Sequence, residues 1–306
     1  MVLSCSRFHQ VCALAGATLV LASSVPASPI AGPDVTAALA HRATVVPKDT
    51  LQGKSGKLLA RIISGQREGG IRVLRELFGD TTSGRPGIYT AASMAPGRSF
   101  SIISLLPFSA KQRGRVGSYF MGNWPREQRA TDGLPDGFIE VTRENQDTPV
   151  SEHFRLRDFL THDQQTVWPK YLVLEEALID KLELVISDLK LRGHVVNHVS
   201  VMSGFRTPQY NVKGVGRGGR AMNSRHQYGD AADIFVDSDR NGRMDDLNRD
   251  GRVDVRDTRI VLQSVERIEQ QYPDLIGGAG LYPATRAHGP FIHVDVRGNK
   301  ARWGLS

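Results

Sequence analysis

Residues 224–233, Ser-Arg-His-Gln-Tyr-Gly-Asp-Ala-Ala-Asp, decide the fold together with residues 291–297, Phe-Ile-His-Val-Asp-Val-Arg. His226 and Asp233 lie seven residues apart, and a bend from loop to strand would bring both side chains onto one ion. His293 lies in an apolar run that predicts a strand, where a buried imidazole needs a polar partner. Two imidazoles and one carboxylate, with a fourth position left open, are typical of a catalytic zinc site. We therefore take these three residues as candidate metal ligands.

The sequence around these motifs predicts a mixture of helices and strands. Apolar residues recur at helical spacing over residues 174–189, and Gly193 ends that helix. A second amphipathic helix is expected over residues 261–272. Strands are expected over residues 195–202 and 291–296. The expected fold class is α+β, with a small antiparallel sheet and packed helices in the C-terminal half.

The preceding segment, residues 51–150, has a different pattern of apolar residues, glycine and proline. It begins with a helical pattern, clearest over residues 71–78. Short β-like runs follow over residues 99–106 and 117–122, separated by glycine and proline. Residues 126–150 have the composition of a loop. We expect a helical start, a small β-rich domain and a linker.

The N-terminus has the layout of a secretory signal. Arg7 precedes an apolar run over residues 11–25, and the small residues that follow suit cleavage before Ser28. The run is shorter than the roughly 20 residues needed to cross a bilayer. We therefore expect a signal peptide over residues 1–27, a linker over residues 28–50 and no stable membrane anchor. This predicts export to the periplasm, the cell wall or the medium.

The composition excludes several classes of protein, of metal ligand and of partner. The 306 residues are 40% hydrophobic and 23% charged, which excludes a coiled coil, a collagen-like chain and a wholly disordered chain. Both cysteines, Cys5 and Cys12, lie inside the predicted signal peptide. A mature chain without cysteine has no disulfide and no thiolate ligand. The net charge is +7, but the basic residues are scattered and form no recognition motif, so no nucleic-acid partner is expected.

Three segments in order carry a family resemblance: Ser-Gly-Phe-Arg-Thr-Pro-Gln-Tyr-Asn at 203–211, Ser-Arg-His-Gln-Tyr-Gly-Asp-Ala-Ala-Asp-Ile at 224–234, and His-Val-Asp-Val-Arg at 293–297. Residues 151–306, about half of the chain, thereby resemble the D-alanyl-D-alanine carboxypeptidase-like zinc peptidases, which cleave peptidoglycan. The resemblance implies one catalytic zinc on the three candidate ligands. It also implies peptidoglycan peptides as substrates.

Arg206 lies in the first of these segments. The resemblance implies that Arg206 stabilises an oxyanion or holds a substrate carboxylate, and a fixed guanidinium suits either role. Ser203 and Tyr210 could line the substrate pocket or serve the structure alone.

The chain departs from the family pattern just before the last ligand. Many members place an acid or a histidine two or three residues before it, whereas this chain has Phe291 and Pro290. His288 and Asp295 are the nearby alternatives. His288 could transfer a proton, or it could be an ordinary surface histidine. Asp295 is expected to orient a ligand histidine or an arginine from outside the ligand set.

The N-terminal segment and the candidate ligands predict an exported zinc metallopeptidase that uses metal-activated water. The resemblance implies that it hydrolyses peptide bonds in peptidoglycan stem peptides. These features leave open whether it is a D,D- or L,D-carboxypeptidase or an endopeptidase, and they do not give the oligomeric state. The alternative is a non-catalytic module, ordered by zinc and calcium, that binds a cell-wall peptide or a protein partner. The signalling domain of Hedgehog proteins, which resembles the same peptidase fold, is a precedent for that alternative.

A second signal is an acidic cassette over residues 237–257, which holds seven aspartates. Oxygen side chains recur with the spacing of an EF-hand-type calcium loop in two overlapping frames, each with glycine at position six. The first frame has Asp237, Asp239, Asn241 and Asp245 at positions 1, 3, 5 and 9, with Asn248 at position 12. The second has Asp246, Asn248, Asp250, Asp254 and Asp257 at positions 1, 3, 5, 9 and 12.

The cassette resembles dockerin or thrombospondin type 3 calcium repeats. The resemblance implies one or two structural Ca²⁺ ions inserted between the zinc-ligand motifs, where they would order the framework of the zinc site. The alternative is a solvated acidic loop paired with its own arginines.

Overall fold

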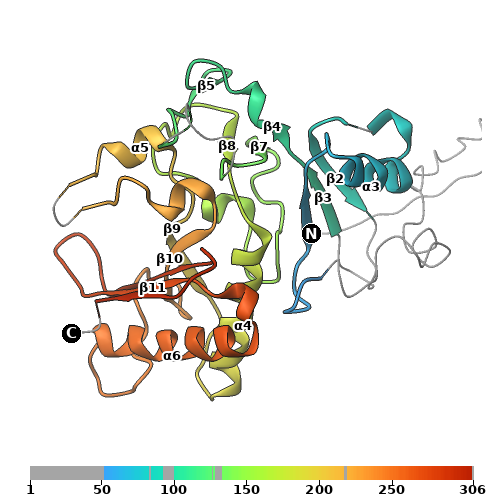
Figure 1. Ribbon diagram of the computed structural model, residues 1–306. Coiled ribbons are helices and arrows are strands. Elements are labelled where there is room, and N and C mark those ends of the chain that lie inside the picture. Colours follow the sequence, from blue (N-terminus) through green and yellow to red (C-terminus); the bar gives the residue numbers. More distant parts are fainter. Residues whose placement is uncertain are drawn as a thin grey trace, which may run out of the picture. The chain divides into compact units, whose positions relative to one another are not determined.

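The computed structural model describes residues 52–82, 84–91, 100–125, 127, 133–216 and 219–304 (Figure 1). The predicted signal peptide and linker, and with them both cysteines, lie outside these residues. Among the described helices, none combines the length and the apolar character needed to cross a membrane.

The first described elements form a three-stranded sheet with one helix beside it (Figure 1). Its strands are β1 (Ala60–Ile63), β2 (Gly87–Ala91) and β3 (Phe100–Ser104). β3 is central, parallel to β1 and antiparallel to β2. The helix α3 (Glu68–Phe78) confirms the helical pattern over residues 71–78. The expected helical start is wrong at β1, because a four-residue strand is specified by its distant partner β3 rather than by local periodicity.

A second group of strands connects this sheet to the C-terminal half. β4 (Leu106–Pro107), β7 (Gly137–Val141) and β8 (Lys170–Leu172) form an antiparallel sheet, and β5 (Arg115–Val116) pairs with β6 (Tyr119–Phe120). The expected loop over residues 126–150 is therefore interrupted by β7, whose Phe138 and Ile139 are buried.

The largest sheet lies in the C-terminal half. Its five strands are β9 (Val199–Ser203), β10 (Ala231–Val236), β11 (Gly278–Tyr282), β12 (Phe291–Asp295) and β13 (Ala301–Trp303). They are ordered β13-β11-β12-β10-β9, antiparallel except for the β11–β13 pair. The strand expected over residues 291–296 is confirmed, and the strand expected over 195–202 begins later, at Val199.

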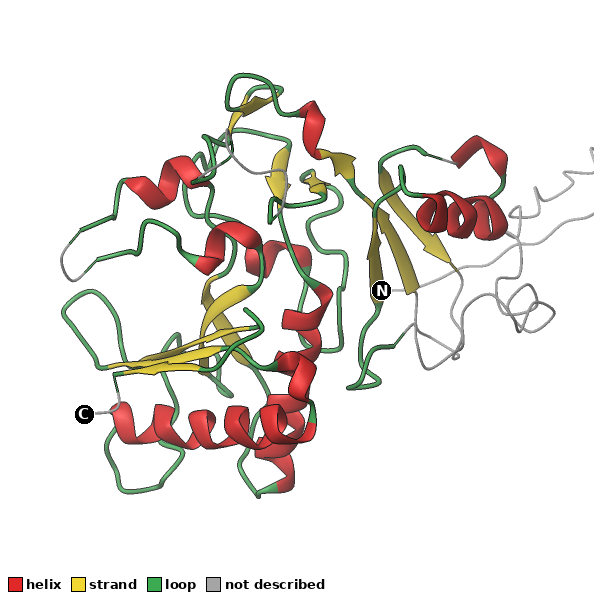
Figure 2. Cartoon of the chain, in the orientation of Figure 1, coloured by secondary structure: helices red, strands yellow, loops and turns green. Residues whose placement is uncertain are grey.

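Two long helices cover one face of this sheet (Figure 2). They are α4 (Glu176–Leu191) and α6 (Val255–Gln271), which pack on each other while α6 contacts β11 and β12. Both expected helices are confirmed. The remaining helical elements are α5 (Pro208–Val212) and the 3₁₀ turns η1 (Asp80–Thr82), η2 (Phe108–Ala110), η3 (Leu156–Phe159), η4 (Arg225–Tyr228) and η5 (Pro273–Leu275).

The mixture of helices and sheets confirms the α+β class. A cluster of buried apolar side chains extends from Leu58 to Val294 and includes residues on both sides of position 150. The division into residues 51–150 and 151–306 stays a prediction.

Candidate metal centre

The side chains of the candidate site form one row across the largest sheet. The row runs through the paired positions Ser203, Asp233, His293, Gly280 and Trp303, on β9, β10, β12, β11 and β13. Paired residues on neighbouring strands point to the same face of a sheet. The neighbouring residue Arg302 points to the other face, where it contacts Glu269 of α6. The site therefore occupies the face turned away from α6.

His226 joins this row from η4, the turn before β10. Gly229 follows η4 with a left-handed backbone (φ 71°), and a Cβ there would overlap the backbone of Val173. Glycine therefore permits the tight turn. The turn brings His226 Nε2 to 3.2 Å from Asp233 Oδ1, which confirms the expected bend from loop to strand.

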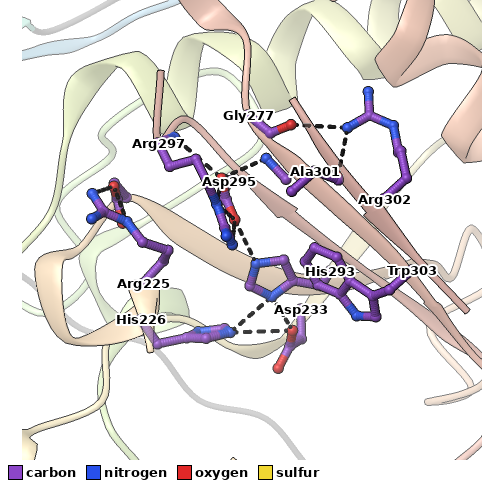
Figure 3. Close-up of polar contacts among 12 residues, drawn as sticks. Arg225, His226, Asp233, Gly277, His293, Asp295, Arg297, Ala301, Arg302 and Trp303 are labelled. Atoms are coloured by element: carbon purple, nitrogen blue, oxygen red, sulfur yellow. Dashed lines mark hydrogen bonds and ion pairs between the residues drawn. The ribbon is translucent and has the colours of Figure 1, made fainter. Parts of the chain in front are cut away.

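Three ligand atoms converge in the buried centre of the site (Figure 3). His293 Nδ1 lies 2.9 Å from Asp233 Oδ1 and 3.1 Å from His226 Nε2. A point equidistant from three atoms at such separations is about 1.8 Å from each, close to zinc bond lengths of about 2.0–2.1 Å. The three side chains are therefore already gathered at the spacing of a metal ligand set.

The outer nitrogen of each histidine is held by an oxygen acceptor. His226 Nδ1 donates to the carbonyl oxygen of Gly204 at 2.7 Å, and His293 Nε2 donates to Asp295 Oδ2 at 3.0 Å. A neutral imidazole protonated on its outer nitrogen presents a lone pair on the inner one. Two lone pairs and a carboxylate oxygen then face one another, an arrangement that a cation relieves. The donor chemistry fits zinc.

The electrostatics of the site also favour a positive charge at this point. Burial lowers the pKa of His226, although Asp233 opposes this shift. Burial also acts against a proton on His293, but its hydrogen bonds with Asp233 and Asp295 raise its pKa. The pKa of Asp233 is held well below its ordinary value because His226 and His293 outweigh the effect of burial. A proton and a metal ion would compete for the same position.

Asp295 orients His293 from outside the ligand set, as the sequence predicts. Its carboxylate accepts the backbone N–H of Gly278 at 2.6 Å and the Nε–H of Arg297 at 2.9 Å (Figure 3). These bonds and the one from His293 keep its pKa far below the ordinary value despite burial. The carbonyl oxygen of Asp295 also accepts a bond from the buried Lys181 of α4 at 2.8 Å. Asp295 is thus fixed at both its backbone and its carboxylate.

Arg206 lies beside the candidate ligands. Its Nη2 donates to Asp233 Oδ2, and its Nε donates to Ser203 Oγ at 2.8 Å. Asp233 can therefore turn one oxygen to the histidines and the other to a guanidinium. The Ser203 hydroxyl is buried against Arg206, while Tyr210 lies on α5 and contacts the guanidinium of Arg220 through its ring.

His288 lies in the loop before β12. Its Nδ1 donates to the carbonyl oxygen of Gly289 at 2.8 Å, and its ring contacts Phe291 edge-on with 4.9 Å between centroids. Phe291 and His293 alternate with Ile292 and so share one face of β12. His288 therefore contacts Phe291, whose side chain is the neighbour of His293 on this face of β12, rather than the candidate ligands.

The acidic cassette forms two successive loops with the same backbone conformation. Position four of each loop is left-handed, at Arg240 and Arg249 (both φ 59°), and so is position six, at Gly242 (φ 77°) and Gly251 (φ 81°). The carboxylate at position one accepts the N–H of that glycine in both loops. Residues 237–245 and 246–254 therefore form a nine-residue structural repeat, where the sequence predicts two overlapping twelve-residue frames.

The two loops hold the same number of aspartates and arginines but differ in how the aspartates are placed. In the first, oxygens of Asp237, Asp239 and Asp245 lie within 4.8 Å of one another, a group that could hold a metal ion. Asn241 accepts the N–H of Arg243, and Asn248, at position twelve, already belongs to the second loop.

In the second loop an arginine lies between the carboxylates. Arg256 Nη1 is 2.8 Å from Asp250, and its Nη2 is 2.7 Å from Asp254. Asp246 accepts the Gly251 N–H, and Asn248 accepts the Asp250 N–H. Asp257 caps α6 together with Asp254.

Sequence reasoning missed Trp303 and Gly280 as parts of the site. The Trp303 ring lies against the His293 ring, with centroids 5.2 Å apart, and crosses β11 at Gly280. No local pattern marks these residues, because their place follows from strand pairing. A short β-like run after residue 300 is the one feature of the sequence that could have indicated a strand carrying Trp303.

Comparisons of the chain with protein-family models, with curated proteins and with solved structures found no match.

Proposed function

We propose that this chain is an exported zinc metallopeptidase that hydrolyses peptide bonds in peptidoglycan stem peptides. The observation that supports the proposal most strongly is the buried triangle of His226 Nε2, His293 Nδ1 and Asp233 Oδ1, with both histidines held from outside. Three protein ligands with a fourth position free are typical of catalytic rather than structural zinc. The choice of peptidoglycan follows from the resemblance of residues 151–306 to the peptidase family.

The roles of the residues follow from their positions. Zinc held by the triangle would supply an activated water and polarise the peptide carbonyl. Arg206 places a positive charge next to Asp233, where it can offset negative charge that develops on the substrate oxygen. Asp295 keeps the His293 ring in place. His288 is the candidate for proton transfer, since Asp295 is already engaged by His293 and Arg297.

The alternative, a binding module without turnover, has one specific observation in its favour. Phe291 and Pro290 occupy the positions before His293 where the resembled family has a proton acceptor, and the Phe291 ring stacks on Tyr282 with 4.5 Å between centroids. In this alternative the same triangle binds metal, and Arg206 binds a carboxylate of the peptide or partner.

Mass spectrometry of digests distinguishes the two functions. The mature chain, beginning at Ser28 and loaded with zinc and calcium, is incubated with purified peptidoglycan and with defined stem peptides. We expect new fragments that are absent with His293→Ala and with chelated protein. Their masses would identify the bond that is cut. Retention of zinc and binding of wall material without any cleavage would contradict the peptidase and support the binding module.

We further propose that the first cassette loop binds Ca²⁺. Three carboxylates that lie within 4.8 Å of one another repel in the absence of a cation, and oxygen ligands at this loop spacing suit calcium. Asp237 directly follows β10, which carries Asp233, so an ion in this loop would fix the end of the strand that holds a zinc ligand. In the second loop Arg256 and Ca²⁺ would compete for Asp250 and Asp254.

A further inference from the structure

The C-terminal strand β13 contributes a side chain to the metal centre. Trp303 is paired with Gly280 of β11, and Gly280 is paired with His293 of β12. Trp303 is thus two strands away from His293, a separation of roughly 9–10 Å in a sheet. Its ring nevertheless lies against the imidazole, with centroids 5.2 Å apart and planes tilted by 46°.

Gly280 makes this contact possible. A Cβ at position 280 would overlap the indole ring of Trp303. Every other residue type would therefore push the ring away from His293. Gly280 has no unusual backbone angle that requires glycine, so the space it leaves for Trp303 is the physical reason for glycine here.

Other contacts fix the orientation of Trp303. Its indole Nε1 donates to the Tyr282 hydroxyl at 2.9 Å. The guanidinium of Arg297 lies 5.7 Å from the Trp303 ring centroid, and the same arginine binds Asp295, which in turn holds His293. His293 and Arg297 thus each contact both Asp295 and Trp303. Figure 3 shows the hydrogen bonds of Asp295 within this group.

We infer that Trp303 is a positioning residue of the metal centre. The polar contacts of His293 with Asp295 and Asp233 lie at its two ring nitrogens, and they leave the ring free to tilt about the line that joins these nitrogens. The indole, packed on the imidazole, restricts that tilt and keeps Nδ1 directed at Asp233 and His226. Trp303 also excludes water from that side of His293. The inference depends on the metal centre of the proposed function.

The test uses Co²⁺ as the metal, because its visible spectrum reports coordination geometry. In Trp303→Ala we expect Co²⁺ affinity to fall about 10–100-fold, as is usual when an outer partner of a ligand is removed. The visible spectrum of the bound Co²⁺ should change as well. Trp303→Phe, which keeps an aromatic ring, should stay close to wild type. Gly280→Ala, which displaces the indole without removing it, should reproduce the effect of Trp303→Ala.

Trp168→Phe is the matched control, since that indole packs on Arg143 and Lys170 instead. Circular dichroism confirms that each variant is folded. Unchanged Co²⁺ affinity and spectrum in both folded Trp303→Ala and Gly280→Ala would overturn the inference. Failure of the wild-type chain to bind Co²⁺ more tightly than His226→Ala would instead overturn the metal centre itself.

Discussion

His226→Ala is expected to lose the bound zinc equivalent of the wild-type chain. The substitution removes one of three candidate protein ligands, and in metalloproteins even the loss of an outer partner of a ligand typically weakens metal binding about 10–100-fold. We therefore expect affinity to fall by more than about 100-fold. Elemental analysis after gel filtration should find about one zinc per wild-type chain and almost none in the variant.

His194→Ala is the matched control for this experiment. His194 follows α4, away from the candidate ligands, so its loss should leave the zinc content unchanged. Equal zinc in wild type and His226→Ala would show that the buried triangle is not the binding site.

Calcium is expected to stabilise the wild-type chain against heat. A ligand that binds only the folded state adds about 2.7 kcal/mol to the free energy of unfolding at about 100-fold its Kd. For a chain of this size we expect a rise in Tm of roughly 4–5 °C. Asp239→Ala removes one of the three grouped carboxylates of the first loop and should abolish most of that rise. Differential scanning calorimetry with and without Ca²⁺ measures both.

The control for calcium is Asp80→Ala, an exposed acid outside the cassette. It should keep the full calcium response. A Tm that Ca²⁺ does not raise in any of the three proteins would mean that the cassette is an acidic loop neutralised by its own arginines, as Arg256 already does in the second loop.

The sequence predicts the features that depend on neighbours along the chain. The helices α4 and α6 follow from apolar periodicity. The bend from His226 to Asp233 follows from a glycine-containing turn between two residues that lie seven positions apart. The two cassette loops are predictable for the same reason, since all their ligand positions are local. The position of His293 is harder to predict, because its strand β12 must pair with β10 before the imidazole lies next to Asp233.

Features that depend on pairing between distant segments were not predictable. β1 has four residues and is defined by β3, some forty residues later. The contact of Trp303 with His293 requires the registers of two strand pairs at once, and Gly280 alone gives no local sign of it. The engagement of Arg206 by Asp233 and Ser203 likewise became visible only in the folded chain, because many acids compete for each arginine.

Zinc X-ray absorption spectroscopy of the loaded wild-type chain shows whether His226, Asp233 and His293 hold one zinc ion. We expect an inner shell of two imidazole nitrogens with the remaining ligands oxygen, at about 2.0–2.1 Å and without sulfur. A shell composed of oxygen alone, without the scattering pattern of imidazole rings, would contradict that assignment.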